Sequence, residues 1–221
     1  MSVSSGRFGR QLVSLLILMA ILAFFFLGAD KWTIDSIKLF LFEHGTLNSI
    51  LRKIDPICNF LFHGATQISA AFILFITGKY LYRPLYLPGK TFLITLCTSG
   101  LTVQIIKHLV GRARPRIIDS FIAIGPSLHV DYDSFPSGHT ALAFSIACIL
   151  SSYFKRYSVI FYSFAALAGF DRVKAGSHFP SDVIAGAFIG IAVTKLLSFR
   201  LGQESDPGTC APPPHQGQCG D

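Results

Sequence analysis

Apolar residues occur along this chain in long runs that short charged segments separate. The clearest run covers residues 12–29 and follows Arg7 and Arg10. Because a membrane-spanning helix needs about 20 apolar residues, this run predicts a first transmembrane helix. A signal peptide is the alternative interpretation. Its apolar core usually has only about 7–15 residues, whereas this run is longer and further apolar runs follow it.

Five more apolar runs follow the first one. Some are short for a full span, and neighbouring small or aromatic side chains extend them, as Gly138 and His139 do at one start. The pattern predicts an all-α, polytopic membrane protein with about six transmembrane helices in a bundle. We assign these helices to one domain, 1–201, and predict a disordered tail, 202–221. The five runs cover residues 57–77, 91–106, 140–154, 159–170 and 183–199.

Between the first two runs, segment 30–55 mixes apolar and charged residues. Its apolar positions, such as Ile34, Ile37 and Leu41, have near-helical spacing, and charged residues interrupt them. This pattern favours an amphipathic helix on the membrane surface. A re-entrant segment or an ordinary loop helix is the alternative.

The composition supports a membrane protein. The chain is 51% hydrophobic and 14% charged, whereas soluble domains carry about 25% charged residues. The net charge of +7 fits nucleic acid or anionic lipid as a partner. Because the basic residues flank the apolar runs and form no separate patch, we favour lipid and exclude nucleic acid. The five cysteines show no metal-ligand spacing and no disulfide framework.

Basic residues also predict the orientation. If the helices alternate, the loops at Arg7 and Arg10, at 79–90, at 155–156 and at Arg200 all lie on one side. The positive-inside rule makes that side cytoplasmic, together with both termini. The opposite face then receives 30–55, 111–135 and 171–180.

Three charged clusters lie on or beside that non-cytoplasmic face. In the first, Lys107 and Arg114 are seven residues apart and share one face of a helix that Pro115 ends. Guanidinium groups offer paired donors that match phosphate oxygens. A basic loop that binds anionic headgroups without chemistry is the alternative. Arg112 and Arg116 are expected to face water or lipid headgroups.

The second cluster, 136–139, suits a helix start before an apolar run. Free N–H groups at a helix start bind anions, and Gly138 allows a ligand to approach the backbone closely. His139 would then lie in the first turn and point toward the same surface. His139 could alternatively be a polar residue at the membrane boundary.

The third cluster holds Arg172, His178 and Asp182. Because Pro180 disfavours helix at the preceding residue, His178 is expected just before the last span and Asp182 in its first turn. A nearby carboxylate can hold one imidazole nitrogen as a donor and leave the other free to attack. Asp182 could instead be only a favourable charge at a helix start.

Together the clusters indicate phosphoryl transfer. One histidine can attack phosphorus while the other protonates the leaving oxygen, and three cations neutralise the transferring group. The sequence has no carboxylate cluster that would hold a metal. It therefore predicts hydrolysis of a phosphate ester through a phosphohistidine, without metal or other cofactor.

At these residues the chain resembles the type 2 phosphatidic acid phosphatase superfamily, whose pattern is KxxxxxxRP, PSGH and SRxxxxxHxxxD. The order and the spacings match. The resemblance implies that His178 is the nucleophile, Asp182 orients it and His139 is the general acid. It also implies a set of phosphate-binding groups: Lys107, Arg114, Ser137, the Gly138 amide and Arg172.

One residue departs from this pattern. Asp171 stands where the family usually has serine before the arginine. Its carboxylate would repel phosphate if it faced the site. We therefore expect Asp171 to turn away from the site or to pair with Arg172 or Lys174.

The family is broad, so the resemblance leaves the substrate open. Soluble haloperoxidases that use vanadate share the motifs, but the apolar runs argue against that class. The chain looks like a bacterial lipid phosphatase of the inner membrane with its active site facing the periplasm. Candidate lipids are phosphatidylglycerophosphate, phosphatidate, undecaprenyl diphosphate and lipid A. The alternatives are a lipid-headgroup phosphotransferase and a non-catalytic lipid-binding or transport protein. Beyond the lipid substrate and the bilayer, no obligatory protein partner is inferred.

Overall fold

The computed structural model of the chain describes residues 28–118 and 122–204. Nearly all of the predicted first span and most of the predicted tail lie outside these residues. The described segments are helical, apart from connecting turns and one isolated bridge between Arg112 and Ala123. The prediction of an all-α protein is therefore confirmed for the described part of the chain.

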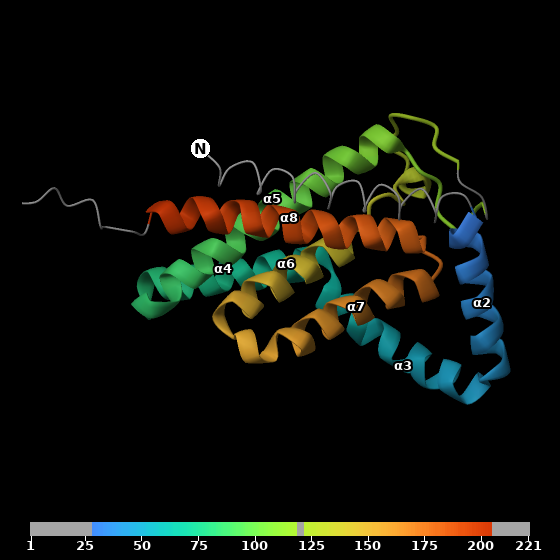
Figure 1. Cartoon of the computed structure of the whole chain (residues 1–221), viewed down its shortest axis with the longest axis horizontal. Helices are drawn as coiled ribbons and strands as arrows, with labels where there is room; N and C mark the ends of the chain where they lie inside the picture. Colours follow the sequence, from blue (N-terminus) through green and yellow to red (C-terminus); the bar gives the residue numbers. More distant parts are fainter. Residues whose placement is uncertain (1–27, 119–121, 205–221) are drawn as a thin grey trace, which may run out of the picture.

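Most of the described helices follow one another with short connections, and a longer connection, 111–137, joins α5 to α6 (Figure 1). Three of the connections contain 3₁₀ turns: η2 (Arg83–Leu85), η3 (Val130–Tyr132) and η4 (Lys155–Tyr157). The α-helices are α2 (Asp30–Glu43), α3 (Gly45–Phe62), α4 (Gly64–Tyr80), α5 (Tyr86–Val110), α6 (Gly138–Tyr153), α7 (Ser158–Lys174) and α8 (Pro180–Glu204).

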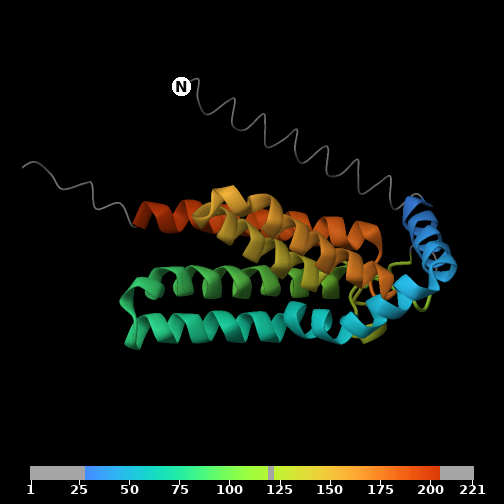
Figure 2. The same ribbon diagram turned by 90° about the horizontal axis from the view of Figure 1, so that it is seen from below.

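Helices α4 to α8 run side by side along the long axis, and α2 crosses one end of this bundle (Figures 1 and 2). Helix α6 is central because it packs against α5, α7 and α8. Small side chains fill its contact with α7, where Ala143, Ala147, Ala165 and Ala168 form one buried cluster. The three clusters of the sequence meet near the end of the bundle that α2 crosses.

Helices α6 and α8 approach each other at backbone distance. A Cβ atom placed on Gly190 of α8 would lie only 2.1 Å from the carbonyl oxygen of Ala141 in α6. The hydroxyl of Ser145 also donates to the Gly190 carbonyl at 3.2 Å. Small residues at helix crossings allow such close packing, as is common in membrane proteins.

Within residues 28–118 and 122–204, two helices are long and apolar enough to cross a membrane, Arg83–Val110 and Pro180–Ser198. A third span results if α3 and α4, which meet at a bend of 47°, count together. Helix α6 is apolar but shorter. Apart from His63 and Phe154, the five later apolar runs lie within helices α3 to α8, while the number of six spans stays a prediction.

Two of the predicted segments are broken where the sequence suggested continuity. The run 57–77 is interrupted at His63, and segment 30–55 is interrupted at His44. In both places the next residue is a glycine, Gly64 or Gly45, which is a poor helix former. The amphipathic segment thus becomes two helices, and the second continues to Phe62.

Candidate active site

The first cluster sits where α5 ends and the chain turns back. Gly111 ends the helix in the left-handed region at φ +57°, and its N–H donates to the Lys107 carbonyl at 2.9 Å. A Cβ atom there would lie 1.9 Å from the Gly125 carbonyl oxygen. Glycine is therefore required at this turn, which carries Arg114 back beside Lys107.

The second and third clusters sit at adjoining helix starts. Helix α8 begins at Pro180, and the Asp182 carboxylate accepts the Phe179 N–H at 2.7 Å, which closes a helix-capping arrangement. The Ser137 N–H, just before α6, donates to the Asp182 carbonyl at 3.0 Å. This bond holds the two helix starts together.

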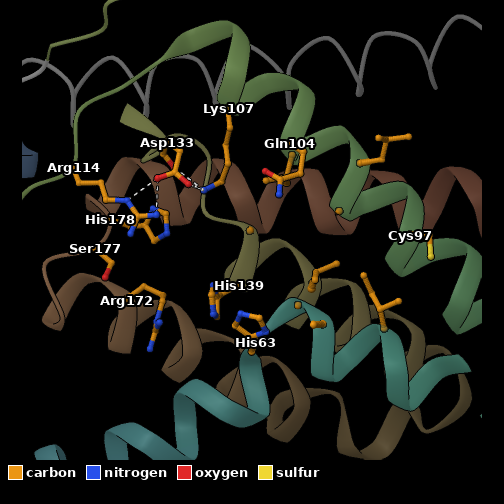
Figure 3. Close-up of a pocket in the computed structure, with 18 residues that line it drawn as sticks. His63, Cys97, Gln104, Lys107, Arg114, Asp133, His139, Arg172, Ser177 and His178 are labelled. Carbon is orange, nitrogen blue, oxygen red and sulfur yellow. Dashed lines mark hydrogen bonds and ion pairs between the residues drawn. The ribbon is translucent and has the colours of Figure 1, made fainter. Parts of the chain in front are cut away.

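These elements surround a cavity of about 700 Å³ (Figure 3). Two predicted site residues, Ser137 and Asp182, are not on its wall, because both are fully buried behind it. The Ser137 hydroxyl accepts a hydrogen bond from Thr140 at 2.9 Å. The other predicted site residues all line the cavity: Lys107, Arg114, Gly138, His139, Arg172 and His178.

His178 is held as one tautomer. Its Nδ1 lies 2.6 Å from the carbonyl oxygen of Ser134. Because a carbonyl oxygen can only accept, Nδ1 carries the hydrogen and Nε2 keeps a free lone pair. Burial lowers the pKa of the imidazole, and the nearby Asp182 carboxylate opposes this change. The neutral ring that a nucleophile requires is therefore favoured at neutral pH.

Asp182 supports His178 indirectly. Its Oδ2 is 3.8 Å from Nδ1, longer than a hydrogen bond. The same oxygen accepts the Ser134 hydroxyl at 2.5 Å. Asp182 thus holds Ser134 in place, and the Ser134 carbonyl in turn orients the His178 ring. The sequence suggested a direct contact instead, because the four-residue spacing gives no sign of the intervening Ser134.

The expectation that Arg112 faces water or headgroups is wrong. Arg112 is 1% exposed and forms ion pairs with Asp182 at 2.5 Å and with Asp30 at 2.8 Å. Its guanidinium also lies 4.0 Å from the centre of the Phe179 ring. Charged groups are buried at this depth only when they are paired, and here one cation joins α2 to the start of α8. Arg116, by contrast, has an exposed side chain, as expected.

Lys107 and Arg114 converge on one carboxylate, as Figure 3 shows. Arg114 Nε donates to Asp133 Oδ1 at 2.7 Å, and Lys107 Nζ donates to the Asp133 carbonyl at 2.6 Å. Lys107 Nζ is also 3.5 Å from Asp133 Oδ2. The two cations are therefore close enough to share a single anion at the cavity wall.

The prediction that Asp171 pairs with its neighbours is confirmed. Its carboxylate accepts from Arg172 Nε at 3.2 Å and lies 3.6 Å from Lys174 Nζ. Helix α3 contributes as well, because Asn59 accepts from Arg172 Nη1 at 2.9 Å and Asp55 pairs with Lys174. The Arg172 side chain lines the cavity, and the carboxylate of Asp171, which is not a lining residue, partly balances its charge.

The variant Asp171→Ser removes this balancing charge and restores the residue usual in the family. We expect inorganic phosphate to inhibit phosphate release about five-fold more strongly in the variant, since one charged contact of Arg172 is lost. Inhibition constants measured in one detergent test this. The matched control is Asp35→Ser, which removes an exposed carboxylate from α2. Unchanged inhibition in Asp171→Ser would show that Asp171 does not compete with phosphate for Arg172, and weaker inhibition would show that Asp171 holds Arg172 in place.

His139 lies on the opposite part of the cavity wall from Lys107 and Arg114 (Figure 3). Its Nε2 is buried and has no hydrogen-bond partner among the described residues. The ring of His63 meets the His139 ring edge-on, with the centroids 5.6 Å apart. An imidazole in this position can exchange a proton with a group that enters the cavity.

The cavity has an apolar side that the motifs did not indicate. It extends from the charged end between α4, α5 and α6 (Figure 3). Its apolar lining residues are Ala65, Ile68, Leu101, Val103 and Leu142. A phosphate group at the cations and a hydrocarbon chain along this wall would thus fit one ligand.

Several supporting residues were missed by the sequence reasoning: Asp30, Asn59, His63, Asp133 and Ser134. Only the acidic ones carried a signal. Asp30 and Asp133 are carboxylates beside basic clusters in a chain with few charges, and buried charges need partners. Asn59, His63 and Ser134 gave no such indication.

Comparison with known proteins identifies the class. The model of the PAP2 superfamily matches residues 88–204, which include all three clusters. The match covers more than half of the chain, so the chain belongs to the PAP2 superfamily. The matched segment begins after α4, and α2, α3 and α4 lie before it.

Individual relatives point to lipid phosphatases. A lipid A 1-phosphatase of Rhizobium johnstonii is 35% identical over 144 residues, or 62% of this chain and 59% of the relative. The crystal structure of Aquifex aeolicus LpxE matches 68% of this chain and 86% of that chain, with a TM-score of 0.51 and 30% identity.

A third comparison concerns the fold alone. The crystal structure of a PAP2-type phosphatidylglycerolphosphate phosphatase from Bacillus subtilis matches 89% of this chain and 98% of that chain. The TM-score is 0.63 and the identity 24%. The chain spans about 59–62% of the length of the two Rhizobium lipid A 1-phosphatases that it matches.

Proposed function

We propose that this protein is an integral membrane phosphatase that hydrolyses a phosphate monoester or diphosphate of a lipid. One observation carries the proposal: two histidines and three cations line one end of a cavity whose other side is apolar. Membership of the PAP2 superfamily and the names of the relatives support it. The proposed catalytic domain covers 1–201.

The proposed reaction has two steps. First, Nε2 of His178 attacks phosphorus, an N–P bond forms, and the P–O bond to the lipid breaks while His139 protonates the leaving oxygen. Second, water attacks the phosphohistidine, His139 takes the proton from the water, and the N–P bond breaks to release phosphate. The tautomer that Ser134 imposes on His178 supports this assignment.

The cations have a common task in both steps. Lys107, Arg114 and Arg172 would neutralise the phosphoryl oxygens, with help from the Gly138 N–H at the start of α6. Lys107 and Arg114 already share one carboxylate, Asp133, and a phosphate would exchange for it. We propose that no metal takes part, since these charges perform the neutralisation.

We further propose that the site opens on the non-cytoplasmic side of a bacterial inner membrane, with both termini in the cytoplasm. The basic loops on the other side of the predicted bundle support this orientation. Four lipids remain candidate substrates: lipid A, phosphatidylglycerophosphate, phosphatidate and undecaprenyl diphosphate. Relatives of this chain include enzymes named for the first two.

A phosphate-release panel with the purified full chain tests the function. We expect release from at least one of the four lipids in mixed micelles, and equal rates with and without a chelator. Loss of activity in chelator that magnesium restores would contradict the metal-free mechanism. A phosphorylated acceptor lipid in place of free phosphate would indicate a phosphotransferase. Lipid binding without turnover of any lipid would indicate a binding or transport protein.

A further inference from the structure

The arrangement of the two histidines places the leaving group in the cavity. In phosphoryl transfer the attacking and leaving atoms lie roughly in line on opposite sides of phosphorus. With His178 attacking and His139 protonating the leaving oxygen, the lipid end of the substrate must extend past His139. The wall beyond His139 is therefore the surface that the leaving group contacts.

Two polar side chains face this part of the cavity from opposite walls: His63 lies beside His139, and Gln104 lies across the cavity on the side of Lys107 (Figure 3). His63 is at the junction of α3 and α4 and touches the His139 ring edge-on. Gln104 is one turn before Lys107 on α5 and shares its face. Among the described residues, neither side chain has a hydrogen-bond partner within the protein, although each offers a donor and an acceptor.

We propose that His63 and Gln104 form a subsite that recognises hydrogen-bonding groups on the leaving part of the lipid. The inference rests on the proposed function. His63 precedes the segment that the family model matches, whereas Gln104 lies within it, so only the His63 half of the subsite would come from the helices before that segment.

The chemistry of the wall restricts the leaving group. An amide and an imidazole recognise hydroxyl, carbonyl or amide groups. Next to them lie Ile68, Leu101 and Leu142, which suit hydrocarbon. The subsite thus fits a leaving group of the sugar or glycerol type that carries acyl chains. A polyprenyl or simple alkyl phosphate has no group for His63 or Gln104 to bind.

The test compares two substrates in each variant. One is a glycerol- or sugar-based lipid phosphate, and the other is a long-chain alkyl monophosphate without hydroxyl groups. The variants His63→Phe and Gln104→Leu keep the size of the side chains and remove the hydrogen bonds. We expect each to lower the ratio of the two kcat/KM values, glycolipid or glycerolipid over alkyl phosphate, by about 10-fold to 100-fold.

The chain offers a matched control for His63. His44 stands at the junction of α2 and α3, also before a glycine, and its exposed ring stacks on Phe40. His44→Phe should leave the ratio of the two kcat/KM values as it is. The inhibition constant of inorganic phosphate should stay constant in all three variants, since the phosphate-binding cations are not altered.

The possible results separate this inference from the proposed function. If His63→Phe and Gln104→Leu slow both substrates equally, or slow neither, the subsite is refuted while lipid phosphatase activity stands. If the unaltered protein hydrolyses the alkyl phosphate faster than every hydroxylated lipid, the subsite is also refuted. If the unaltered protein releases phosphate from no substrate, the proposed function fails first.

Discussion

Replacing His178 by alanine is expected to reduce phosphate release by at least about 10³-fold with every lipid that the protein hydrolyses, because the attacking nitrogen is lost. His178 is 3% exposed, and only its Nε2 is left free for attack. Initial rates over a range of substrate concentrations measure the loss. A brief incubation with ³²P-labelled lipid should label the unaltered protein through an acid-labile phosphate and leave the variant unlabelled.

The control for this experiment is His44→Ala, which removes an exposed imidazole far from the cavity and should keep full activity. Thermal unfolding of His178→Ala in detergent must also be followed, since the side chain is buried. Turnover in a folded His178→Ala variant at a rate near that of the unaltered protein would remove His178 as the nucleophile. Labelling of a different residue would lead to the same conclusion.

Replacing Arg112 by methionine is expected to destabilise the protein by about 3–5 kcal/mol, because two buried carboxylates lose their shared cation. The carboxylates belong to Asp30 and Asp182, whose side chains are 6% and 0% exposed. For a chain of this length we expect the apparent melting temperature in detergent to fall by about 10 °C. Adding Asp30→Asn should recover part of the loss, since one unpaired charge is then removed.

The comparison variant is Arg116→Met. Arg116 pairs with Asp131 at 3.0 Å, but both side chains are 49% exposed. Surface pairs of this kind contribute only about 0–1 kcal/mol, so the melting temperature should change by less than about 3 °C. An equal fall in melting temperature in the two variants would show that the buried ion pairs of Arg112 contribute no more to stability than the exposed pair of Arg116.

Much of the wall of the candidate site could be predicted from the sequence, because its residues lie in short motifs with fixed spacing. Pro180 and Asp182 indicate the start of α8, and local rules of helix capping sufficed there. The expectation that Lys107 and Arg114 share one face of a helix is wrong, because α5 ends at Val110 and Gly111 turns the chain before Arg114.

The remaining contacts depend on the tertiary fold, so no local rule could supply them. Arg112 reaches Asp30, which is 82 positions away in the chain. Arg172 reaches Asn59, 113 positions away. Burial reverses the usual expectation for a charged residue, and the sequence does not show which arginine of the segment 112–116 is buried. Ser134 escaped notice because its backbone carbonyl makes the contact with His178.

The close crossing at Gly190 has a consequence for how the protein responds to its membrane. Helices adapt to bilayers of different thickness mainly by tilting. Because α6 and α8 touch through their backbones, we expect them to tilt together. His139 and Asp182, which lie at the starts of these helices, should then keep their distance from each other. Helix α4 also packs closely on α5, where a Cβ atom on Gly89 would lie 2.6 Å from the Cα atom of Phe75, so these two helices are likewise expected to tilt together. A change of bilayer thickness is thus expected to shift the pair α4 and α5 relative to α6 and α8 more than it changes the distance between His139 and Asp182.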